Sequence, residues 1–129
     1  MSQNIRYQSS HEYARKKDDE IVTGISDHAQ AELGDIVFVE LPTIGKTIAK
    51  GVTFGVVESV KAASDLYMPM AGTITAVNTE LEGDPSLVNK DCMGAGWMIQ
   101  FSPVNPSEWE SLLDEVAYEA QSAAQAGKE

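Results

Sequence analysis

The chain has 129 residues, enough for one domain with its own hydrophobic core but not for two. Twenty acidic and nine basic residues give a formal net charge of −11. This charge argues against electrostatic binding to nucleic acid or to an anionic membrane, and it favours partners with basic surfaces. No apolar run approaches the about 20 residues of a membrane-spanning helix, and the N-terminus resembles neither a signal nor a transit peptide. We therefore expect one cytoplasmic domain, residues 1–129.

Most of the chain predicts short β-strands separated by turns. β-Branched and aromatic residues are concentrated in six short runs, with glycine or proline between them. In the last run Trp97, Ile99 and Phe101 alternate with Met98 and Gln100, which is typical of a half-buried strand. The pattern predicts a mainly β protein, a small sandwich or a partly closed barrel. The predicted strands are residues 21–25, 35–41, 52–60, 66–70, 72–77 and 97–101.

One helix is predicted inside the strand region. Asp27, followed three residues later by Gln30, resembles a capping box at the start of a helix. Gly34 is a natural end for that helix, because glycine readily adopts the backbone conformation that terminates helices. The sequence therefore predicts a short internal helix over about residues 27–33.

The most informative segment surrounds Lys61. A β-branched strand leads into Lys61, two alanines and a serine follow, and then a second strand begins, so the pattern predicts a hairpin with the lysine at its tip. Lys61 is the only basic residue between positions 51 and 89. Spacing alone is also satisfied by a solvated turn residue. An acylated lysine at such a tip, however, would be a flexible arm able to visit several active sites.

A second helical region is predicted near the C-terminus. Ser107 and Glu110 form another possible capping box, and Asp114 can begin a further helix through the alanine-rich stretch. The C-terminal helical segment is expected over about residues 107–126.

The sequence shows no sign of an independent catalytic centre. Cys92 is the only cysteine, no Cys/His cluster suggests a metal site, and neither His11 nor His28 is paired with a nucleophile in the sequence. No phosphate-binding glycine motif or catalytic triad is recognisable. We interpret Cys92 as a small, inert residue near a turn.

The segment from Glu58 to Asp65 resembles the lipoylation signature of glycine cleavage H proteins. The resemblance implies that Glu58, Ser59, Val60 and Ala62 are the residues recognised around the modified lysine. It implies a barrel-sandwich hybrid fold, related to lipoyl and biotinyl domains, with a short internal helix and C-terminal helices. Further segments resemble the family in the same order along the chain: residues 10–13, 24–30, 33–35, 37–42, 96–98 and 112–113.

The same resemblance implies a cofactor and a function. Lipoate would be attached covalently to Lys61 by a lipoate ligase or by a lipoyl or octanoyl transferase. The chain would carry an aminomethyl group from glycine decarboxylase, a pyridoxal-phosphate enzyme, to a tetrahydrofolate-dependent aminomethyltransferase. A flavin-dependent dihydrolipoamide dehydrogenase would reoxidise the arm. The chain would then be a monomeric carrier protein, a substrate of its partner enzymes rather than an enzyme itself.

Members of the family shield the loaded arm in a cleft of the protein body. By resemblance, Ser10, Glu12 and Asp65 are the candidate polar residues of this cleft, where a carboxylate can pair with the cationic amine of the carried group. Tyr13 stands where tryptophan is common in the family and should keep an aromatic packing role. Glu32 is assigned no role.

Two alternatives to this shuttle remain open. The chain could be a lipoyl relay that donates its lipoyl group to other lipoyl domains. It could be a biotin carrier, although biotinyl lysines usually lie between two methionines, whereas Lys61 lies between Val60 and Ala62. Lipoyl domains of 2-oxoacid dehydrogenases typically have an aspartate before the lysine and belong to longer chains, and this sequence shows neither feature.

Overall fold

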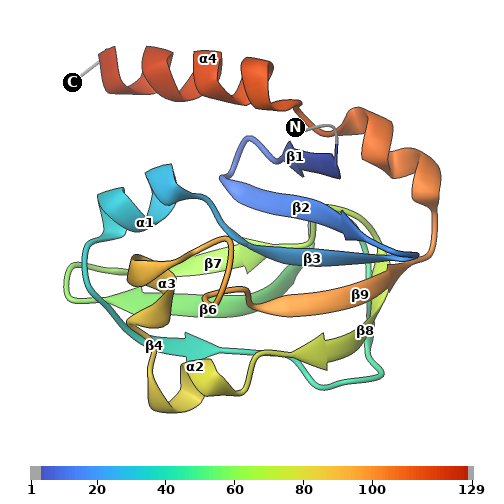
Figure 1. The fold of residues 1–129 in the computed structure, drawn as a ribbon, viewed down its shortest axis with the longest axis horizontal. Helices are drawn as coiled ribbons and strands as arrows, with labels where there is room; N and C mark the ends of the chain where they lie inside the picture. The colour runs from blue at the N-terminus through green and yellow to red at the C-terminus, as the bar shows by residue number, and fades with distance from the viewer. Residues whose placement is uncertain (1–3, 128–129) are drawn as a thin grey trace.

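Two antiparallel sheets lie face to face with the hydrophobic core between them (Figure 1). The computed structural model describes residues 4–127, and the side chains of residues 4–121. Within this part of the chain, the larger sheet has the order β1 (Ile5–Tyr7), β2 (Glu12–Lys17), β3 (Glu20–Ile25), β9 (Ile99–Pro103), β8 (Gly72–Val77) and β5 (Thr47–Ile48). The smaller sheet has the order β4 (Ile36–Glu40), β6 (Thr53–Ser59) and β7 (Ala63–Tyr67).

Apolar side chains from both sheets fill the core. Val57 and Leu66 come from the smaller sheet, and Ile74, Ile99 and Phe101 come from the larger one; all five are at most 2% exposed. Burial of this apolar surface is the main favourable contribution to folding. The mainly β architecture predicted from the sequence is confirmed.

The internal helix α1 (Asp27–Leu33) has the predicted bounds, but its cap is different. Ser26 is the N-cap, and its hydroxyl accepts a hydrogen bond from the Ala29 N–H at 3.2 Å. The predicted capping box is wrong, because the Asp27 carboxylate accepts from the Gln30 side chain instead of capping the backbone. Gly34 ends the helix as predicted, with a φ of 81°.

The C-terminal region contains a 3-10 helix, η2 (Pro106–Ser111), followed by α4 (Glu115–Gly127). The second predicted capping box is wrong, because η2 begins directly after Asn105 and the Ser107 hydroxyl donates to the Asn105 side chain at 2.7 Å. Asp114 starts α4 as predicted: its carboxylate accepts from the Ala117 N–H at 2.9 Å. In Figure 1, α4 lies along the side of the molecule that carries β1.

Several strands differ from the prediction. The segment predicted at residues 66–70 is β7 (Ala63–Tyr67), because the chain leaves the sheet before Pro69, which has no N–H to donate. The strand predicted at 97–101 lies at Ile99–Pro103, and Met98 is fully buried instead of alternating outward. The prediction missed β1, β2, β5 and two short helices, α2 (Glu80–Gly83) and α3 (Leu87–Lys90).

Candidate functional site

Lys61 lies at the tip of the β6–β7 hairpin, as predicted. The turn is held by Ser59, whose hydroxyl oxygen accepts hydrogen bonds from the N–H groups of Lys61 and Ala62, both at 3.1 Å. The Ser59 N–H also donates to the Ala62 carbonyl at 2.8 Å. These bonds fix the backbone of the tip, so that its side chains project from a rigid base.

The tip is also attached to the body of the protein. The Val60 N–H donates to the Asp35 carbonyl at 3.0 Å, and the Val60 side chain remains 68% exposed. The exposed Lys61 side chain bends toward α1, where its ammonium donates to the Glu32 carbonyl at 2.9 Å. A cation suits this position because the last carbonyls of a helix have no partner within the helix and carry partial negative charge.

A cleft of about 240 Å³ lies beside this hairpin, between β7, α1 and the turn before β2. Lys61 does not line it, but its ammonium is hydrogen-bonded to the carbonyl of Glu32, which is one of the lining residues. Both apolar and polar side chains line the cleft. The predicted cleft residues Ser10, Glu12 and Asp65 all line it, together with His11, Ile25, Ala29, Glu32, Leu33, Val57, Ser64 and Leu66.

Glu12 is the buried carboxylate of the cleft, only 1% exposed. One carboxylate oxygen accepts from the Ser10 hydroxyl at 2.5 Å and from the Gln8 side chain at 3.0 Å; the other accepts from the Tyr67 N–H at 2.9 Å. Burial raises the pKa of Glu12, and these hydrogen bonds oppose that rise by stabilising the charged form. Glu12 therefore joins the start of β2 to the end of β7.

Asp65 occupies a different environment. It lies on β7, paired with Val56 of β6, and it is exposed at the cleft. Its carboxylate is therefore available to a charged group entering from solvent, whereas that of Glu12 already receives three hydrogen bonds. Of the two predicted carboxylates, Asp65 is the one better placed to pair with a ligand.

The four residues predicted to be recognised around the lysine lie together on the hairpin. Glu58, Val60 and Ala62 are exposed, and Ser59 is half-buried because it holds the turn. Glu58 is paired with Ala63 across the hairpin. The structure thus presents Glu58, Val60 and Ala62 next to Lys61 on one accessible surface.

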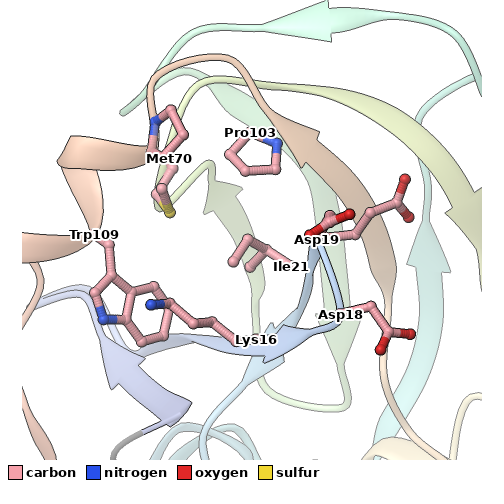
Figure 2. Close-up of a pocket in the computed structure, with 9 residues that line it drawn as sticks. Lys16, Asp18, Asp19, Ile21, Met70, Pro103 and Trp109 are labelled. Atoms are coloured by element: carbon pink, nitrogen blue, oxygen red, sulfur yellow. The ribbon is translucent and has the colours of Figure 1, made fainter.

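A larger hollow, of about 360 Å³, lies away from this site (Figure 2). Trp109 and Lys16 lie on one side of it and Asp18 on the other, and the Lys16 ammonium is 4.6 Å from the centre of the indole ring. Because β2 runs from Glu12 in the cleft to Lys16 in this hollow, about 13 Å of strand separates the two. The hollow is not part of the Lys61 site.

Sequence reasoning missed the group that surrounds His11. His11 has a left-handed backbone conformation, with a φ of 83°, and its ring is hydrogen-bonded to the Tyr118 hydroxyl at 2.6 Å. Tyr118 is 107 positions away in the sequence, so no local pattern could have indicated this contact. Nearby, His28 lies 3.4 Å from the Glu32 carboxylate, a local interaction within α1.

Other residues considered from the sequence have structural roles. Tyr13 is fully buried, packs over Gly24 and donates to the Cys92 carbonyl at 3.0 Å, so the predicted packing role is confirmed. Cys92 is buried, and burial raises the pKa of its thiol to about 11, which keeps it protonated and unreactive at neutral pH.

The described residues hold neither a metal-binding cluster nor a membrane-spanning helix. Among residues 4–127, no group of three or more His, Cys, Asp or Glu side chains could hold a metal ion. None of the helices in this part of the chain has the length and apolar character needed to cross a membrane.

Comparisons with known proteins agree with this geometry. A crystal structure of a glycine cleavage system H protein from Mycobacterium marinum superposes with a TM-score of 0.85 at 33% identity, covering 95% of this chain and 99% of that one. A glycine cleavage system H protein of Xanthobacter autotrophicus is 53% identical over 115 residues, 89% of this chain and 92% of the relative. One from Bacteroides thetaiotaomicron is 50% identical over 118 residues, 92% and 94% of the two chains.

The fold is that of lipoyl-type β-sandwich domains, as predicted. The sequence model of the family described as "Glycine cleavage H-protein" matches residues 5–125. The chain belongs to the glycine cleavage H-protein family.

Proposed function

We propose that this chain is the lipoyl-bearing shuttle of the glycine cleavage system and that Lys61 carries the lipoyl group. The observation that supports this most directly is an exposed lysine at the tip of a braced hairpin, next to a cleft large enough to receive part of an arm. An enzyme that modifies Lys61 can reach it, because Glu58, Val60 and Ala62 on the same turn are also exposed.

The residues around Lys61 fit a lipoyl arm. The amine is free of any carboxylate partner among the described residues and is held by a backbone carbonyl, so its acylation breaks no ion pair. Lipoate, once attached, supplies a dithiolane that carries a one-carbon group and two electrons. The chain's own contribution is to position this arm, through the hairpin, and to shelter its end, through the cleft.

The walls of the cleft suit the charge of the proposed cargo. The aminomethyl group carries a cationic amine, and Asp65 offers an exposed carboxylate at the cleft, which Ser10 also lines. Pairing within the cleft would keep water and unrelated nucleophiles from the carried group between enzymes. In this proposal Glu12 maintains the cleft wall through its three hydrogen bonds, and Asp65 contacts the cargo.

The partners in this proposal are glycine decarboxylase, the aminomethyltransferase, dihydrolipoamide dehydrogenase and the enzyme that attaches lipoate. The chain acts as their common substrate and not as an independent enzyme. A monomer in the cytoplasm is the form predicted from the sequence, and both points stay predictions.

The intact mass of the protein isolated from its own cells tests the proposal, with peptide mapping of the modified position. One lipoyl group on Lys61 is the expected result. Biotin at Lys61 would support the biotin-carrier alternative. An unmodified lysine, in cells that lipoylate their other targets, would overturn the carrier function while leaving the fold unaffected.

The cleft role has its own test, the substitution Asp65→Asn. It should shorten the lifetime of the aminomethyl-loaded protein severalfold without slowing lipoylation, since Asn cannot pair ionically with an amine. Asp18→Asn is the matched control: Asp18 is exposed, lies at the far end of β2 and has a φ of 56° that asparagine tolerates. Equal lifetimes for the two variants would contradict the cleft role.

A further inference from the structure

The C-terminal helix α4 contacts segments that border the cleft, chiefly through Tyr118. Tyr118 of α4 is 5% exposed and its ring stacks on Tyr7, with the ring centres 4.2 Å apart and the planes 8° from parallel. Its hydroxyl is hydrogen-bonded to two groups that belong to different elements: the His11 ring at 2.6 Å and the Ser26 hydroxyl at 2.5 Å.

One of these partners lines the cleft, and the other caps the helix that lines it. His11 lies in the turn before β2, and the neighbouring residues Ser10 and Glu12 line the cleft with it. Ser26 is the N-cap of α1, the helix that lines the cleft with Ala29, Glu32 and Leu33. The Tyr118 hydroxyl therefore joins the turn before β2 to the N-terminus of α1, the two segments whose residues line this part of the cleft.

The turn held in this way has an unfavourable backbone conformation. His11 has a φ of 83°, in the left-handed region that residues other than glycine seldom adopt, so the surroundings must hold it there. The backbone contributes, since the Ser26 N–H donates to the His11 carbonyl at 2.9 Å. A second contact from α4 also holds the turn: the Gln121 side chain donates to the Ser9 carbonyl at 3.0 Å.

We propose that Tyr118 is a positioning residue for the arm cleft, which sets the spacing of these two segments through His11 and Ser26. Tyr118 does not line the cleft and touches no cargo; it acts through the turn and the helix cap. The inference rests on the proposed carrier function, but the contact itself can be tested in the unlipoylated protein.

The test compares Tyr118→Phe with Tyr7→Phe. The first variant keeps the stacked rings and removes the hydroxyl that joins the two segments. The second removes the other hydroxyl of the same stacked pair, which faces the Met93 sulfur at 3.9 Å and is not part of the cleft. Both are conservative changes of one oxygen atom, so thermal unfolding should show two folded proteins. Gln121→Ala serves as a third variant, on the partly exposed side of α4.

Hydrogen exchange of the amides of Gln8, His11 and Ser26, in unlipoylated protein, is the first readout. Tyr118→Phe should speed exchange at these amides about fivefold or more, as expected for the loss of one or two hydrogen bonds that close the turn. Gln121→Ala should change it in the same direction but less, and Tyr7→Phe should leave it unchanged. Equal exchange in the two phenylalanine variants would overturn the contact between α4 and the two segments.

The lifetime of the aminomethyl-loaded, lipoylated protein is the second readout. Tyr118→Phe should shorten it at least twofold while the rate of lipoylation at Lys61 stays unchanged, because the hairpin is untouched. A general loss of stability would instead change the lifetime of the loaded form and the rate of lipoylation together. Faster exchange with an unchanged lifetime would overturn the positioning role. A lysine that is never lipoylated would refute the carrier function alone, because the exchange measurement stands without it.

Discussion

Lys61 lies beside the cleft that Glu12 lines, and the two charged side chains have opposite environments. The Lys61 ammonium is exposed and is held by one backbone carbonyl, whereas the Glu12 carboxylate is buried and receives hydrogen bonds from three groups. A charge that is easily removed suits a lysine that is to be acylated. The buried, hydrogen-bonded carboxylate of Glu12 suits a structural role, since it connects β2 to β7.

Replacing Lys61 by arginine separates fold from function. Lys61→Arg should change the free energy of unfolding by no more than about 0.5 kcal/mol, because the side chain is exposed. Lipoylation should be lost completely, since a guanidinium is not acylated by enzymes that modify an amine. Denaturant unfolding and intact mass measure the two effects. A variant that unfolds, or that is still modified, would contradict the assignment of Lys61.

Glu12 makes stability depend on pH in a direction unusual for a carboxylate. Because its folded pKa lies above the ordinary value of 4.5, the native state binds more protons than the unfolded chain between these two values. The contribution of Glu12 to the free energy of unfolding therefore falls as the pH rises through this window. Stability of the parent relative to Glu12→Gln, measured by urea unfolding from about pH 4 to pH 7, should decrease. A constant or increasing difference would argue against this behaviour.

At the scale of elements, the sequence predicted what local patterns specify. The helix at residues 27–33 and the strand at 72–77 have the predicted bounds, because a terminating glycine and β-branched residues act locally. Strand β2 was missed because Glu12–Lys17 is rich in charge and lacks β-branched residues; its pairing with β1 and β3 stabilises it instead. The formation of this strand thus depends on its neighbours in the sheet and not on its own sequence.

The residues of the site likewise divide into those that a local pattern predicts and those that only the folded chain brings together. The hairpin and its lysine could be predicted from residues 56–67, whose pattern is local. The convergence of Ser10, Glu12 and Asp65 on one cleft came from resemblance to a family, since these positions are up to 55 residues apart. Nothing in the sequence indicated Tyr118, because its partners become neighbours only when α4 packs against the body.

One glycine is required for the pairing of β4 with β6. A Cβ at Gly55 would lie 2.2 Å from the Glu40 carbonyl oxygen, a backbone atom that cannot move aside easily. Gly55→Ala should therefore lower the free energy of unfolding by about 1–3 kcal/mol or more. Gly83→Ala is the control, because its added methyl would have no atom within 4 Å apart from its chain neighbours and the backbone of its own helix. It should shift stability by less than about 1 kcal/mol. Similar unfolding curves for both variants would refute the argument.

For the molecule as a whole, the net charge of −11 governs its encounters. The described residues contain few ion pairs. In one of them, 3.9 Å long, a half-buried Arg6 meets an exposed Glu110. Most carboxylates therefore contribute to a negative field around the protein. Such a field attracts partners that present basic surfaces and speeds their association.

This field predicts a dependence on salt. The association rate with the aminomethyltransferase should fall about tenfold or more between 0.05 and 0.5 M salt, because ions screen charges beyond a few ångströms. Stopped-flow measurements with the lipoylated protein would show it, and the dissociation rate should change much less. An association rate that is insensitive to salt would mean that apolar contacts around the hairpin dominate the encounter.

The pairing of Tyr7 with Leu113 has a consequence for the behaviour of the protein at high concentration. Their two backbone hydrogen bonds, both 2.8 Å, satisfy the last residue of β1, the outermost strand of the larger sheet. An open edge strand offers unsatisfied N–H and C=O groups to other chains and so promotes aggregation. The segment that leads into α4 thus covers this end of the edge strand and reduces the tendency of the protein to associate with itself through β1.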